Sequence, residues 1–83
     1  MPQDLFELRR SRGIEQQALA KFMGVHKATL SQIERGRTDL SLLRAKKIAE
    51  CLQVSLDAVY SAAEETRRRW EARPHPKLAF QAS

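Results

Sequence analysis

The sequence predicts an all-α protein made of short helices. Apolar residues recur at helical spacing across residues 3–60, and breaks at Gly13, Gly24 and Gly36 divide this pattern into short segments. No stretch alternates apolar and polar residues for long enough to indicate a β-strand. The 83 residues are enough for one small domain with a modest core.

The first helix is expected over residues 3–12. Leu5 and Leu8 share one face of this segment. Asp4 and Glu7 occupy its first turns, where the positive end of the helix dipole favours acidic side chains.

Four further helices follow in the expected order. The second spans residues 16–23 and the third spans residues 27–35, so only three residues lie between them. The fourth starts near Ser41, a good N-cap, and the fifth starts near Leu56, with a helical extension expected beyond residue 60 to about Ala72. The inward-facing residues of the second and fourth helices are Leu19, Ala20, Met23, Leu42, Ala45, Ile48, Ala49 and Leu52.

The second and third helices have the spacing of a helix-turn-helix. Two short helices joined by three residues must cross at a steep angle. Ala20 supplies the small residue where the helices touch, and Gly24 accepts positive φ at the turn. This segment is therefore the most informative part of the chain.

The third helix has two different faces. At about 100° per residue, five side chains fall within a sector of about 140°, namely Lys27, Ala28, Ser31, Gln32 and Arg35. Leu30 and Ile33 point the other way, toward the core. A short, polar and partly basic face suits the major groove of DNA, where lysine donates to guanine and glutamine bonds to adenine.

These residues resemble the phage repressor and Cro-type helix-turn-helix family, the XRE-like transcriptional regulators. The matching segments are Leu8-Arg9, Gly13-Ile14, Gln16, Leu19-Ala20, Gly24-Val25, Thr29 to Gly36, Ser41-Leu42, Ile48-Ala49, Leu52, Val54 to Asp57 and Tyr60. The resemblance implies a compact five-helix, lambda-repressor-like DNA-binding domain over residues 1–60. A C-terminal helical extension over residues 61–73 and a flexible tail over residues 74–83 are expected to follow.

The resemblance also implies roles for particular residues. Those expected to read bases are Lys27, Ala28 and Gln32. Those expected at the DNA backbone or the edge of the contact are Gln16, His26, Thr29, Ser31, Arg35, Arg37 and Thr38, with Asp39 in the same loop. Arg9 and Glu34 are expected to form a buried structural ion pair.

Four residues depart from the family pattern. His26 stands where serine or threonine usually caps the recognition helix, and Glu15 replaces the usual cap of the preceding helix. Leu40 and Gln53 stand where the family often has proline and glycine. These changes are expected to alter loop geometry without threatening the fold.

The function predicted from these features is sequence-specific binding of double-stranded DNA by a transcriptional regulator, most simply a repressor. A homodimer is expected, because one short helix reads few base pairs and a palindromic operator presents two half-sites. The net charge of +5 suits a polyanion. With two histidines and one cysteine, no metal site, cofactor or enzymatic chemistry is expected, and no apolar run is long enough for a membrane span. A cytoplasmic location and a bacterial, plasmid or phage origin are expected.

The C-terminal part leaves two functions open. The residues suggested for a dimer surface are Leu56, Val59, Tyr60 and Trp70, with Ala62, Ala63 and Thr66 on the same stripe as Trp70. The alternative is a protein-interaction module, an antitoxin or antiactivator, in which residues 61–83 bind another protein. Residues 67–69, three arginines, are expected on a solvated face, with Glu64–Arg68 and Glu65–Arg69 pairs. Cys51 is expected to be a core thiol.

Overall fold

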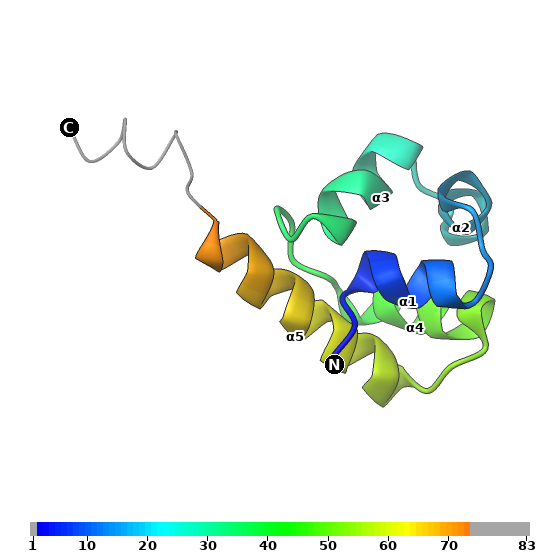
Figure 1. Cartoon of the computed structure of the whole chain (residues 1–83). Helices are drawn as coiled ribbons and strands as arrows, with labels where there is room; N and C mark the ends of the chain where they lie inside the picture. The colour runs from blue at the N-terminus through cyan, green and yellow to red at the C-terminus, as the bar shows by residue number, and fades with distance from the viewer. Residues whose placement is uncertain (1, 74–83) are drawn as a thin grey trace.

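Five α-helices make up the computed structural model, which describes residues 2–73 (Figure 1). They are α1 (Leu5–Ser11), α2 (Gln16–Met23), α3 (Lys27–Glu34), α4 (Leu42–Leu52) and α5 (Leu56–Ala72). No strand occurs within residues 2–73, so the predicted all-α, five-helix fold is confirmed. The tail expected over residues 74–83 lies outside the described residues.

Polar side chains fix where three of the helices begin. Asp4 Oδ1 accepts a hydrogen bond from the backbone N–H of Glu7 at 2.8 Å, and Glu7 Oε1 accepts one from the N–H of Asp4 at 3.1 Å. This capping box places Asp4 outside α1 rather than in its first turn, so the helix starts two residues later than predicted. Ser41 and Ser55 cap α4 and α5 through their hydroxyl groups.

The helices end in left-handed residues at several points. Gly13, Gly24 and Gly36 have φ values of 73°, 74° and 81°. Gln53, which follows α4, has φ 58° and is the one residue other than glycine with positive φ in the described part of the chain. The position where the family often has glycine therefore keeps the left-handed backbone here, at a conformational cost for a side chain with a Cβ.

The core is formed by one apolar face from each helix. Its buried members are Leu5, Leu8, Leu19, Ala20, Met23, Leu30, Ile33, Ala45, Ile48, Leu52, Val59 and Ala62. The prediction that Leu42 faces inward was wrong, because this residue opens α4 at the edge of the core and is 54% exposed. Ala49 and Cys51 pack against the core while staying partly exposed.

The last helix packs along the first. α5 is a continuous helix of 17 residues and crosses the expected boundary at residue 60 without a break (Figure 1). The hydroxyl of Thr66 accepts a hydrogen bond from the backbone N–H of Leu5 at 2.8 Å. Arg69 Nη1 lies 2.9 Å from both Asp4 Oδ2 and Glu7 Oε1. Ala62 and Thr66, suggested for a partner contact, are therefore buried within their own chain.

One residue of the suggested dimer surface is excluded by its burial. Val59 is 0% exposed and lies in the middle of the core, so that part of the prediction was wrong. Leu56 and Tyr60, on the neighbouring faces of α5, are half-buried.

Candidate nucleic-acid interface

The turn between α2 and α3 is compact. The backbone N–H of Val25 donates to the carbonyl of Ala20 at 3.0 Å, and the left-handed Gly24 lets the chain reverse direction. Ala20 is 2% exposed, in accord with a small residue at the crossing of the helices. Figure 1 shows α3 on the outer side of the molecule with α2 beside it.

The outer face of α3 is open to solvent. Lys27, Ala28, Gln32 and Arg35 are exposed, whereas Thr29 and Ser31 are half-buried. Leu30 and Ile33, on the opposite face, are 0% and 1% exposed. The residues suggested for base reading are thus accessible to a duplex, and the core-facing residues fasten the helix to the domain.

A buried polar cluster joins α1, α2 and α3. Arg9 Nε lies 2.6 Å from Glu34 Oε2, and the two side chains are 5% and 4% exposed. Arg9 Nη1 also donates to the carbonyl of Ile14 at 2.8 Å. Gln16 Nε2 donates to Glu34 Oε1 at 3.0 Å. No buried side-chain nitrogen or oxygen atom in residues 2–73 lacks a hydrogen-bond partner, and these bonds fix the start of α2 relative to α3.

The starts of α2 and α3 have no side-chain cap. Glu15 and His26 occupy the N-cap positions, and neither side chain bonds to the backbone of its helix. The first backbone N–H groups of α3 therefore have no intrahelical partner and point outward, as the N-terminal amides of any helix do. His26 is itself exposed at this end of α3.

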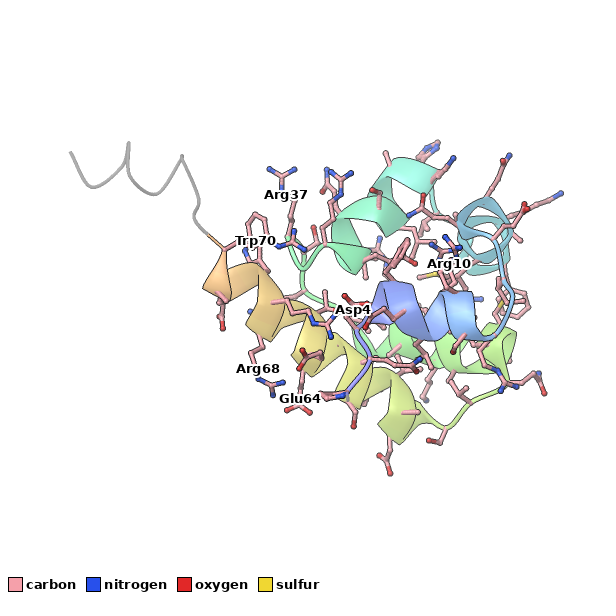
Figure 2. The ribbon with its side chains drawn as sticks, viewed as in Figure 1. Asp4, Arg10, Arg37, Glu64, Arg68 and Trp70 are labelled. Atoms are coloured by element: carbon pink, nitrogen blue, oxygen red, sulfur yellow. The ribbon has the colours of Figure 1, made fainter. Side chains whose placement is uncertain are left out.

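The loop between α3 and α4 contacts both α3 and α5. The hydroxyl of Thr38 donates to Gln32 Oε1 at 3.4 Å, which places the loop beside a candidate base-reading side chain. The guanidinium of Arg37 lies over the ring of Trp70 with 5.6 Å to the ring centre (Figure 2). Asp39, by contrast, forms an ion pair with Arg67.

The structure brings one further cation to this surface. A hollow of about 430 Å³ is lined by Asp4, Phe6, Gln16, Ser31, Glu34, Arg35 and Arg73. Its two carboxylates are paired with Arg69 and Arg9, whereas neither Arg35 nor Arg73 has an ion pair within residues 2–73. Arg35 and Arg73 are therefore the two guanidinium groups of this lining that no carboxylate of residues 2–73 pairs with. Arg73 was not among the functional residues predicted from the sequence. The helical pattern that continues to Ala72 could have indicated that α5 is long enough to bring Arg73 toward α3.

One of the two ion pairs predicted along α5 forms, and the other is replaced by a different pair. Arg69 Nε lies 2.7 Å from Glu65 Oε2, so the Glu65–Arg69 pair is confirmed. Arg68 also pairs with Glu65, one turn back, rather than with the expected Glu64. Trp70, suggested for a dimer or partner contact, is half-buried against the loop of its own chain.

Other kinds of site find little support among the described residues. No group of three or more histidine, cysteine or acidic residues there could hold a metal ion. No helix in residues 2–73 has the length and apolar character needed to cross a membrane. Burial raises the pKa of the Cys51 thiol above its ordinary value, which keeps this group protonated and unreactive at neutral pH.

A comparison with protein families identifies a family model that matches most of the chain. The model HTH_3, described as helix-turn-helix, matches residues 5–59, about two thirds of the chain. The matched region extends from the start of α1 into the first turn of α5. No curated protein and no solved structure matches the chain.

Proposed function

Because this chain belongs to the helix-turn-helix family, a family of DNA-binding transcription regulators, we propose that it binds a specific duplex operator and represses transcription. In this proposal α3 enters the major groove, and the chain acts as a homodimer on a palindromic site. The observation that carries the proposal is the open polar face of α3, which is fastened to the core from behind by Leu30 and Ile33. A regulator of this kind works where the DNA is, in the cytoplasm of a bacterial cell.

Base reading is assigned to three side chains on this face. Lys27 donates to guanine O6 and N7, and Gln32 makes a paired contact with adenine. Ala28 offers its methyl group to thymine or allows close approach of the helix. The bond from Thr38 to Gln32 Oε1 supports this role, because it restrains the glutamine before DNA arrives.

Contacts with the DNA backbone are assigned to residues around the three base-reading side chains. The residues that we assign to phosphates or the groove edge are Gln16, His26, Thr29, Ser31, Arg35, Arg37, Thr38 and Arg73. Arg35 and Arg73 line the same hollow beside α3, and we assign a phosphate of the flanking strand to this pair. With about 6–10 phosphate contacts in the whole complex, affinity falls steeply as salt concentration rises.

The dimer places two copies of α3 about 34 Å apart, one helical turn of DNA. We assign the contact between protomers to Leu56 and Tyr60, which are half-buried on α5. Bound to its operator, such a dimer represses by blocking the access of RNA polymerase.

Selection of bound sequences from random duplexes tests the proposal. The expected result is a shared, two-fold symmetric site, with a complex of two protein chains measured by light scattering. Lys27→Ala and Gln32→Ala each weaken binding to that site by about 1–3 kcal/mol while leaving the melting temperature nearly unchanged. Lys46→Ala, which removes an exposed lysine from α4, serves as the charge-matched control for Lys27→Ala.

Two outcomes would contradict it. Selected sequences without a shared core would exclude operator reading. Cellular activity that survives both α3 substitutions but is lost on removal of residues 74–83 would favour the protein-interaction module instead.

A further inference from the structure

The loop that carries Arg37 and Thr38 rests directly on α5. A Cβ atom added to Gly36 would lie 2.9 Å from the Cβ of Trp70 and 3.0 Å from the carbonyl oxygen of Thr66. The backbone of Gly36 therefore lies too close to α5 for a residue with a Cβ atom. Its φ of 81° also favours glycine.

Two side-chain contacts hold the same loop just after Gly36. The guanidinium of Arg37 lies over the ring of Trp70, and Asp39 pairs with Arg67 one turn earlier on α5. Beneath the loop is a hollow of about 240 Å³, lined in part by Leu40, Tyr60 and Ala63. Because this space is not filled by packed side chains, the position of the loop depends on its contacts with α5.

The way in which Trp70 holds Arg37 leaves the cation able to bind a phosphate. A cation–π contact attracts the charge of the guanidinium to the face of the ring without forming a hydrogen bond, so it does not consume the N–H donors of Arg37. A carboxylate partner would occupy those N–H groups and neutralise the charge. Figure 2 shows Arg37 and Trp70 together near the end of α5, with Arg68 on the other side of that helix.

We propose that Trp70 is a positioning residue for DNA binding, holding Arg37 beside α3 where a backbone phosphate of the operator passes. Arg67 fixes the other end of the loop through Asp39. This inference rests on the proposed function, and it gives the last turns of α5 a role in operator affinity without any contact between Trp70 and DNA.

A double-mutant cycle on the selected operator tests the coupling between the two residues. Arg37→Ala is expected to weaken binding several-fold and to lower the slope of log K against log salt by about 1. Trp70→Ala is expected to produce a similar loss, and the double variant to bind no worse than Arg37→Ala. Additive losses would overturn the proposal, as would a Trp70→Ala variant that binds normally.

Three matched variants separate positioning from other effects. Trp70→Phe keeps an aromatic face and is expected to retain most of the affinity, whereas Trp70→Leu keeps apolar bulk without that face and is expected to lose it. Arg68→Ala, on the far side of α5, removes a charge without touching the loop. Sedimentation measures the oligomeric state, and a loss of dimer in Trp70→Leu would assign the residue to the dimer contact and overturn the inference.

Trp70 also supplies its own signal, since it is the single tryptophan of the chain. Arg37→Ala is expected to change its fluorescence in the unbound protein. Operator DNA is expected to change it in the wild type but not in Arg37→Ala. If the wild type selects no operator, the proposed function fails; if it selects one and Trp70 emission is indifferent to both Arg37 and DNA, only the positioning role fails.

Discussion

Gln16 and Glu34 are hydrogen bonded to each other, with 3.0 Å between Nε2 and Oε1, so the first residue of α2 is tied to the last residue of α3. Glu34 also holds the buried Arg9. A single carboxylate therefore sets the relative position of the two helices whose outer surfaces are assigned to DNA.

Removing the Glu34 carboxylate is expected to destabilise the fold strongly. Glu34→Ala leaves the Arg9 guanidinium buried without its counter-charge, which lowers the free energy of unfolding by about 3–5 kcal/mol. In a small domain this is a large part of the total stability. Urea denaturation measures the change, and Glu64→Ala, at an exposed position on α5, is the control, with an expected effect within about 0.5 kcal/mol. Equal losses in the two variants would contradict the prediction.

Acid is expected to weaken the junction between α1 and α5. The backbone hydrogen bond from Asp4 and then the hydrogen bond from Arg69 hold the pKa of Glu7 below its ordinary value of 4.5. A lowered pKa in the folded state means that Glu7 stabilises the fold above pH 4.5 and that this contribution is lost as the pH falls through the folded-state pKa. The gap in melting temperature between the wild type and Glu7→Gln should therefore narrow from pH 7 to pH 3. A difference in melting temperature that stays constant from pH 7 to pH 3 would show that the charge of Glu7 does not stabilise the fold.

A glycine at position 53 is expected to stabilise the protein. Gln53→Gly removes the strain of a left-handed residue with a Cβ, and after the extra freedom of glycine in the unfolded chain the net gain is about 0.5–1 kcal/mol. Gln17→Gly, at an exposed position inside α2, should instead cost about 0.5–1 kcal/mol. Thermal unfolding of both variants checks the opposite signs.

Replacing His26 separates helix capping from DNA binding. His26→Ser supplies the side-chain cap that α3 lacks and is expected to raise stability by about 0.5–2 kcal/mol. It also removes the imidazole that we assign to a phosphate, so operator affinity should fall. His26→Ala removes the imidazole without adding a cap. Affinity that rises together with stability in His26→Ser would exclude the phosphate contact.

The helices with strong local signals could be predicted closely. The bounds of α2 agree with the prediction at both ends, because Gly24 and the helical spacing of Leu19 and Met23 are local features of the chain. The outward face of α3 could also be derived from the rotation of about 100° per residue, because the direction of each side chain depends only on its position within the same helix.

The surroundings of α5 could not be derived in this way. Periodicity shows that Val59, Ala62 and Thr66 share a face, but it does not show what covers that face. The cover is α1 and the rest of the core, supplied by residues distant in the sequence. For the same reason the contact of Trp70 with Arg37 and the approach of Arg73 to α3 appear only in three dimensions.

The hydrogen bond between Leu5 and Thr66 also bears on biosynthesis. A ribosome adds about 5–20 residues per second, and α1 is synthesised well before the part of α5 to which it is hydrogen bonded. The contact between α1 and α5 therefore forms only after the codons for Thr66 and Arg69 have been translated. A premature stop codon shortly before them would therefore yield a chain that contains the whole helix-turn-helix, with α1 still joined to α3 through Arg9 and Glu34 but without its hydrogen bonds to α5.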